Sequence, residues 1–88
     1  MILHMGGDAV VSTKDIVMIL DVAALSSKAT KQYVEQCKDE GRYIQLEPDD
    51  CKSIIIAKEN GGTMVYVSPI SAATLHKRCE NTQIKDRY

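Results

Sequence analysis

The side chains that most often catalyse reactions or bind metals are few in this sequence, and they are not grouped. Neither of the two histidines, His4 and His76, lies within metal-motif spacing of the other or of a carboxylate pair. No serine lies in a GxSxG elbow, and the Gly-Gly pairs at 6–7 and 61–62 begin neither a GxGxxG nor a GK[ST] pattern. We therefore interpret the histidines as surface or edge residues, the glycine pairs as turns, and the protein as a non-enzyme.

Carboxylates and thiols do not predict a metal or cofactor either. Asp49 and Asp50 have Glu47 nearby, but three carboxylates supply too few oxygens for a calcium loop, so a solvated turn is favoured. The three cysteines are widely spaced and contain no CxxC or CxxH pair. We expect reduced thiols instead of a disulfide framework or a zinc site.

Basic side chains offer the remaining chemistry, which is contact with phosphates. Lys14 lies in a polar interruption between apolar runs, Arg42 follows a predicted helix, and Lys52 opens a predicted hairpin. If the three converge on one face, they form a modest phosphate-contacting patch once repeated in an oligomer. The opposing interpretation is that they only keep the domain soluble, because the formal net charge of −1 lacks the basic signature of most nucleic-acid binders.

A β-hairpin is the strongest local prediction, and the other elements must cover it. The first strand contains the β-branched run Ile54–Ile56, and the second contains the apolar, β-prone residues 64–67. Between them, residues 60–62 read Asn-Gly-Gly, which tolerate the positive φ of a tight turn. An isolated hairpin is marginal in water. Further strands or helices therefore have to bury its apolar side chains.

Extended structure is also predicted before the hairpin. Residues 1–4 and 10–11 favour short strands, and residues 12–15 are a polar bulge or bend that carries an exposed Lys14. Ile16–Leu20 suits either a strand buried on both faces or a short helix. Because Ile and Val dominate this short run, we favour the strand.

Two helices are predicted. The first spans residues 28–40, where Ser26 and Ser27 provide a hydroxyl cap and Gly41 ends the helix. The second begins near residues 68–71 and lasts two to three turns. The apolar stripe of the first helix comprises Ala29, Tyr33, Val34 and Cys37.

Between and after the helices the pattern is more polar. Residues 42–47 favour a half-buried strand, and residues 48–50 form a turn. Residues 80–88 contain one apolar anchor, Ile84, so they are predicted to be a frayed polar C-terminal tail that follows a domain over residues 1–79.

The length of 88 residues fits one domain with a slim core, because the chain has no Trp or Phe and only four Tyr. This composition favours self-association, in which exposed Ile and Val on edge strands make the subunit contacts. The N-terminal segment is too short and not basic enough for a signal peptide, and no apolar run approaches the ~20 residues that span a bilayer. We therefore expect a cytoplasmic protein with no membrane partner.

Three motifs together resemble one known family. MILHMGGDAVVSTKDIV, KSIIIA and YVSPISAATLHKR, in that order and spacing, are similar to the bacterial extracellular matrix regulatory proteins, particularly the B-type members, over residues 1–79. The resemblance implies a small α+β domain that assembles into a closed ring. It also implies kinship with A-type members, which are DNA-binding activators of biofilm-matrix genes and also affect osmoprotection genes.

The resemblance also places the A-type DNA contacts on this sequence. An arginine of the polar segment corresponds to Lys14, which keeps the charge but loses the bidentate geometry. A pair of arginines before the central hairpin corresponds to Asp49 and Asp50, a reversal of charge that would repel DNA at each repeat of a ring. Lys52 matches another basic position.

These observations predict a small, twisted, mainly antiparallel sheet with two helices, in the α+β class, assembled into a ring-like homo-oligomer. The predicted function is that of a DNA-binding transcriptional regulator that uses Lys14, Lys52 and Arg42. The alternative is a protein-interaction ring of the same family that lacks DNA binding and works through a partner protein. A small-molecule substrate is not expected under either interpretation.

Overall fold

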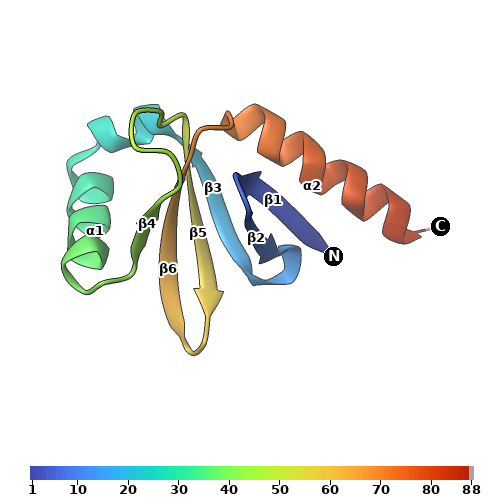
Figure 1. Cartoon of the computed structure of the whole chain (residues 1–88), viewed down its shortest axis with the longest axis horizontal. Helices are drawn as coiled ribbons and strands as arrows, with labels where there is room; N and C mark the ends of the chain where they lie inside the picture. Colours follow the sequence, from blue (N-terminus) through green and yellow to red (C-terminus); the bar gives the residue numbers. More distant parts are fainter. Residues whose placement is uncertain (88) are drawn as a thin grey trace.

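The computed structural model describes the backbone of residues 1–87 and the side chains of residues 1–79. It contains a four-stranded sheet with the strand order β3-β5-β6-β4 and a separate two-stranded sheet formed by β1 and β2 (Figure 1). In chain order the elements are β1 (Ile2–Gly6), β2 (Ala9–Ser12), the 3-10 helix η1 (Thr13–Asp15), β3 (Ile16–Asp21), the 3-10 helix η2 (Val22–Ser26), α1 (Lys28–Asp39), β4 (Tyr43–Gln45), β5 (Ser53–Glu59), β6 (Gly62–Ser68) and α2 (Ala72–Arg87). The predicted α+β class is confirmed.

The predicted central hairpin is confirmed as β5 and β6, which pair antiparallel over their full length. Asn60 and Gly61 both have positive φ, 53° and 78°, as a two-residue type I′ turn requires. β3 pairs antiparallel with β5, whereas β4 pairs parallel with β6. The sheet is therefore mainly antiparallel, and its parallel pair is β4 with β6. β3 and β4 point the same way, and the connection between them contains α1 and crosses two strands.

The β1–β2 hairpin is a sheet of its own, which differs from the single sheet predicted. The polar segment after β2 forms η1 and exposes Lys14, as predicted for this interruption. Because η1 separates β2 from β3, the hairpin does not join the sheet edge. It packs against one face of the four-stranded sheet instead.

The two faces of the sheet carry two separate cores. On one face Ile55 and Tyr66 pack with the hairpin and α2, and on the other Ile54 and Val65 pack with α1 (Figure 1). The alternation follows from the pleat, which sends successive side chains of β5 to opposite faces. The side chains that cover the sheet are Leu3, Met5, Val11 and Leu75 on the first face, and Val34 and Cys37 on the second.

The hairpin is joined to the sheet by a close contact between β1 and the end of β6. The Ser68 hydroxyl donates a hydrogen bond to the Met5 carbonyl and accepts one from the Ile70 N–H at 3.0 Å. Beside it, Gly6 has φ of +128°, and a Cβ at Gly6 would lie 3.0 Å from Pro69 Cδ. Glycine is therefore the residue that fits at the end of β1.

Helix α1 begins and ends where predicted. The Ser27 hydroxyl accepts a hydrogen bond from the Thr30 N–H at 3.5 Å, and Gly41 adopts a φ of +77° after the last turn. The predicted apolar stripe is only half correct. Val34 and Cys37 are buried, whereas Ala29 and Tyr33 are exposed, because α1 covers β5 and β6 but not the edge strand β3.

Two further predictions need correction. β3 is a strand, but it is not buried on both faces, because α1 packs over the central strands and leaves Val17 and Met18 exposed on that face. Helix α2 continues to Arg87 instead of ending after two to three turns and fraying, because residues 80–87 contain no Pro or Gly to stop it. The side chains from Glu80 onward and the backbone of Tyr88 lie outside the described residues, so the division into a domain over 1–79 and a polar tail over 80–88 stays a prediction.

Among the described residues, neither α1 nor α2 has the length and apolar character that crossing a membrane requires. The cytoplasmic location predicted from the sequence stays a prediction.

Candidate nucleic-acid interface

Lys14 is presented by a short, well-anchored turn. It is the middle residue of η1, which contains no buried residue. The Thr13 N–H donates a hydrogen bond to the Met1 carbonyl at 3.0 Å, and β2 and β3 continue directly from the two ends of η1. The lysine side chain is exposed and forms no ion pair with any described side chain, so it is available to contact a phosphate.

Lys52 lies at the opposite end of the same sheet. Its N–H donates to the Ser68 carbonyl at 2.9 Å, and its carbonyl accepts from the Val22 N–H at 3.1 Å. Lys14 lies in the turn just before β3 begins. Lys52 precedes Ser53, which pairs with Asp21, the last residue of β3. β3 has six residues, so at about 3.3 Å per residue its ends are roughly 17 Å apart. One subunit therefore does not bring Lys14 and Lys52 together.

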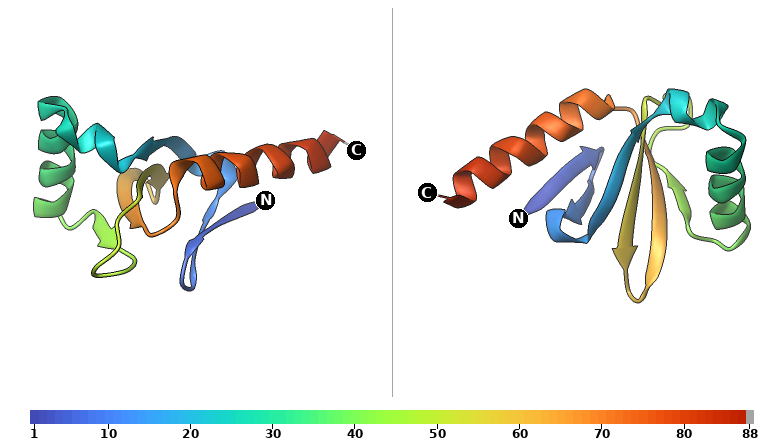
Figure 2. Two further views of the ribbon diagram at one scale, coloured as in Figure 1. Left: turned by 90° about the horizontal axis from the view of Figure 1, so that it is seen from above. Right: turned by 180° about the vertical axis from the view of Figure 1, so that it is seen from behind.

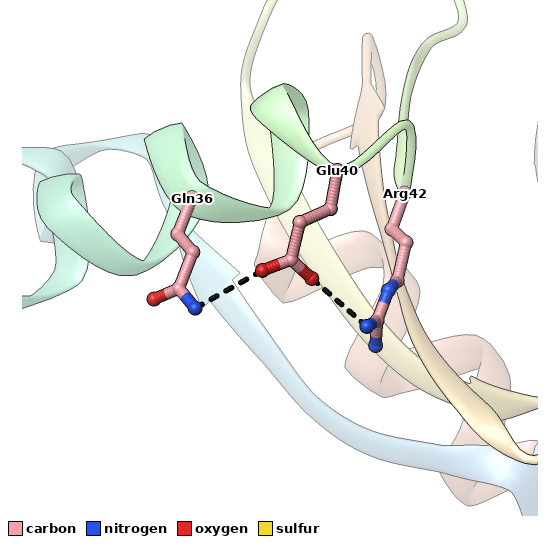
Figure 3. A network of polar contacts seen from close by, with 3 residues as sticks. All are labelled: Gln36, Glu40 and Arg42. Carbon is pink, nitrogen blue, oxygen red and sulfur yellow. Dashed lines mark hydrogen bonds and ion pairs between the residues drawn. The ribbon is translucent and has the colours of Figure 1, made fainter.

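Arg42 lies at neither position. It precedes β4, at the other edge of the sheet from β3, so the width of the sheet separates it from Lys14. One Arg42 Nη atom lies 2.8 Å from Glu40 Oε1, and Gln36 Nε2 donates to Glu40 Oε2 at 3.1 Å (Figure 3). The Glu40 carboxylate therefore compensates the guanidinium charge. The three basic residues therefore do not converge within one chain, because strand order and direction place them at three separate corners of the sheet.

The end of the sheet that holds Lys52 is acidic. Asp49 and Asp50 lie in the loop that links β4 to β5, and Asp21 ends β3 opposite Ser53, the first residue of β5. The strand directions thus gather several carboxylates around one lysine. Repulsion between these carboxylates and a phosphate backbone makes this end a poor DNA contact.

Two cysteine thiols have raised pKa values, for partly different reasons. Burial, and second the Asp50 carboxylate, raise the pKa of the Cys51 thiol, and burial raises the pKa of Cys79. Raised pKa values keep both thiols protonated at neutral pH and so weakly nucleophilic. The three cysteines are free thiols, as predicted.

The described residues contain no constellation that suggests catalysis. No group of three His, Cys, Asp or Glu side chains among them could hold a metal ion. His76 Nε2 lies 3.3 Å from the Ile19 carbonyl, and the Arg78 guanidinium donates to the His4 carbonyl at 3.2 Å. These side chains join α2 to neighbouring strands and play a structural part.

An apolar groove is the feature that the sequence patterns did not reveal. It has a volume of about 340 Å³ and lies between β3 and α1, with Ile56 among its lining residues. Val17, Met18 and Tyr33, which are 52%, 45% and 39% exposed, also line it. The run Ile16–Leu20 predicts burial, and the stripe on α1 predicts burial of Tyr33, so no local signal marks these side chains as surface. The exposure depends on where α1 packs.

Tyr66 is a buried tyrosine whose hydroxyl is paired with a carboxylate. Its hydroxyl donates a hydrogen bond to Glu59 Oε1, and the side chain is only 8% exposed. Burial, then the hydrogen bond and the negative charge of Glu59, raise the pKa of Tyr66 from 10.0 to about 12. Each of these effects disfavours the phenolate.

This shift predicts a loss of stability at alkaline pH. Between pH 10 and about 12 the unfolded chain has lost the Tyr66 proton while the folded chain keeps it, so the unfolded state binds fewer protons and the free energy of unfolding falls as pH rises. The fall reaches up to about 1.4 kcal/mol per pH unit. Urea unfolding at pH 9, 10 and 11 measures it. Tyr66→Phe should show a shallower decline, and an equal decline in both proteins would contradict the assignment.

Comparison with known proteins gives two matches. The sequence profile of a family described as extracellular matrix regulatory protein A-like, or RemA-like, matches residues 2–79. Extracellular matrix regulatory protein B of Bacillus subtilis (strain 168) is 35% identical over 80 residues, which cover 91% of this chain and 91% of that protein. The family match spans the β1–β2 hairpin, the four-stranded sheet and the start of α2.

Proposed function

The chain belongs to the extracellular matrix regulatory protein A-like family, and from this premise we propose that it self-associates and binds duplex DNA as a transcriptional regulator in the cytoplasm. The family's description and the relative's name both denote a regulatory protein. DNA binding, the oligomer and the cellular location are the parts that we propose. Lys14 is the residue to which we assign the main phosphate contact.

The exposed position of Lys14 on η1 is the observation that carries this proposal. A lysine fixed between two strands keeps its place relative to the sheet, so every copy in an oligomer presents it at an equivalent point. One phosphate contact contributes little, but contacts repeated on neighbouring subunits add to the affinity and make it strongly salt-dependent. Lys52 contributes less, because Asp49 and Asp50 precede it in the same loop.

Self-association is supported by the distribution of apolar side chains. The two cores are small and lie on opposite faces of one sheet. Several large apolar side chains are nevertheless exposed, and they cluster on the β1–β2 hairpin and beside the groove next to β3. A small domain that leaves such surface in water gains stability by burying it against another subunit.

Removing the Lys14 charge tests the DNA contact. In gel-shift titrations on duplex DNA at 50 and 200 mM salt, we expect Lys14→Ala to weaken binding several-fold at the lower salt and to reduce the dependence of affinity on salt. Lys31→Ala, which removes an exposed lysine from α1, is the matched control and should bind as the unmodified protein does. Lys14→Arg should retain binding. Equal affinities for Lys14→Ala and Lys31→Ala would reject Lys14 as a contact.

The acidic loop favours a second candidate, an assembly that acts through a partner protein and does not bind DNA. Asp49 and Asp50 would repel phosphates at each repeat. Under this alternative the unmodified protein gives no shifted band even at 50 mM salt, whereas an Asp49→Arg, Asp50→Arg variant gains salt-dependent binding. If the unmodified protein binds tightly and the variant only slightly more so, the alternative fails.

A further inference from the structure

The β3–α1 groove is an open apolar surface on one face of the four-stranded sheet. It is lined by Val17, Met18, Leu20, Ala29, Tyr33 and Ile56, together with Thr30. Its volume of about 340 Å³ has room for about three aliphatic side chains at native packing density. Nothing in residues 1–79 fills it.

The groove stays open because α1 packs to one side of it. The buried residues of α1, Val34 and Cys37, contact the central strands β5 and β6, so α1 leaves Val17 and Met18 of β3 uncovered on this face. The register of β3 also shifts between Ile16 and Met18. This irregularity places Val17 at the outer rim, where its side chain is half exposed.

A second apolar surface lies on the β1–β2 hairpin. Leu3, Met5 and Val11 point into the core. By alternation Ile2, His4 and Val10 lie on the outer face, where Ile2 and Val10 are 55% and 44% exposed and the exposed His4 pairs with Val10. Figure 2 shows the hairpin on the side of the sheet away from α1. The outer hairpin face and the β3–α1 groove are therefore on opposite sides of the molecule and cannot meet within one chain.

We propose that the outer face of the β1–β2 hairpin of one copy seats in the β3–α1 groove of the next copy. The inference rests on the proposed self-association and names its interface. One chain carries both a concave apolar groove and, on the hairpin, a separate outer face with two exposed apolar side chains, Ile2 and Val10, so a second copy can bury each surface against the other. A contact between two different patches is heterologous, and repeated contacts of this kind close into a ring or extend into a filament.

A symmetric contact between two grooves is the competing arrangement, and the hairpin argues against it. Groove-to-groove packing would leave Ile2 and Val10 in water on both subunits and would stop at two copies. The head-to-tail contact covers both surfaces with the same interface. It also leaves Lys14 uninvolved in the apolar contact, because the lysine belongs to the exposed turn η1 and does not line the groove.

Complementation between two variants tests this arrangement. Val17→Glu with Met18→Glu should block the groove, and Ile2→Glu with Val10→Glu should block the hairpin face. Each variant alone should have the mass of one chain by light scattering, with association weakened at least about 100-fold, because burying an unpaired charge is costly. An equimolar mixture should give a species of two chains and no more, since one intact groove and one intact hairpin face remain.

A matched control is available on the other edge of the sheet. Ile44 is 43% exposed on β4 and lines neither surface, so Ile44→Glu should keep the oligomer size of the unmodified protein. The mixed dimer also shows that both variants fold. If the Glu variants are misfolded by circular dichroism, Val17→Ser and Ile2→Ser replace them, and each should weaken association about tenfold.

Each contrary outcome is distinct. If the unmodified protein has the mass of one chain at micromolar concentration, the proposed self-association itself fails. If the unmodified protein assembles and either folded Glu variant keeps its size, self-association stands but this interface is wrong. A hairpin variant that dimerises alone would establish the groove-to-groove contact instead.

Discussion

Replacing Ile55 with alanine is expected to lower the free energy of unfolding by about 2–5 kcal/mol. Ile55 is fully buried in the middle of β5, between Ile19 of β3 and Tyr66 of β6, in the core that the hairpin and α2 cover. The substitution removes apolar contacts and leaves a cavity where three elements meet. A domain of 88 residues has a total stability of about 4–13 kcal/mol, so this single substitution should remove a large share of it.

Urea unfolding followed by circular dichroism measures this change. The protein concentration must be the same for all variants, because self-association stabilises the folded chain by mass action. Ile44→Ala is the matched control, and its cost should stay within about 0.5 kcal/mol, since Ile44 is exposed on an edge strand. If Ile55→Ala and Ile44→Ala lower the free energy of unfolding by the same small amount, Ile55 does not lie in the core as described above.

Ser68→Ala is the second substitution expected to have a large effect, about 2–4 kcal/mol. The Ser68 side chain is fully buried and satisfies two backbone groups, the Met5 carbonyl and the Ile70 N–H. Alanine fills almost the same space but leaves both groups without this partner, and each buried unsatisfied group costs about 1–3 kcal/mol. The loss should appear first at the contact between the β1–β2 hairpin and the end of β6.

Hydrogen exchange locates that loss. In Ser68→Ala the amides of β1 and β2 should exchange faster than those of β5, because the hairpin loses its polar link to the sheet. Ser71→Ala provides the comparison, since the Ser71 hydroxyl accepts from the Thr74 N–H at 3.2 Å at the exposed start of α2. Loss of this cap should cost about 1 kcal/mol and leave the hairpin protected. Uniform exchange throughout Ser68→Ala would contradict the proposed link.

The elements that local chemistry governs were predictable from the sequence. Asn60-Gly61 specifies a two-residue turn, and that turn fixes the register of β5 and β6. Ser27 and Gly41 fix the two ends of α1 in the same way. The motifs that resemble the matrix regulators are likewise local, and the family resemblance is confirmed by the comparisons.

The candidate site was predictable only in part. The polar segment before β3 does expose Lys14, because a run of polar residues between apolar strands has no core to enter. Its distance from Lys52 and Arg42 was not predictable, since it depends on strand order and direction, which arise from contacts between segments far apart in the chain. The acidic surroundings of Lys52 are partly visible in the sequence, because Asp49 and Asp50 lie within three residues of it, whereas the position of Asp21 depends on the pairing of β3 with β5.

The sequence by itself determined the turns, the caps, the class of the fold and the family. The tertiary structure alone decided that the basic residues are dispersed, that the β1–β2 hairpin forms its own sheet, and that α1 leaves β3 uncovered beside an apolar groove. The physical reason is the distance along the chain over which each interaction acts. Turns and caps depend on φ, ψ and hydrogen bonds within a few residues, whereas the exposure of Val17 or Tyr33 depends on which distant segment packs above it.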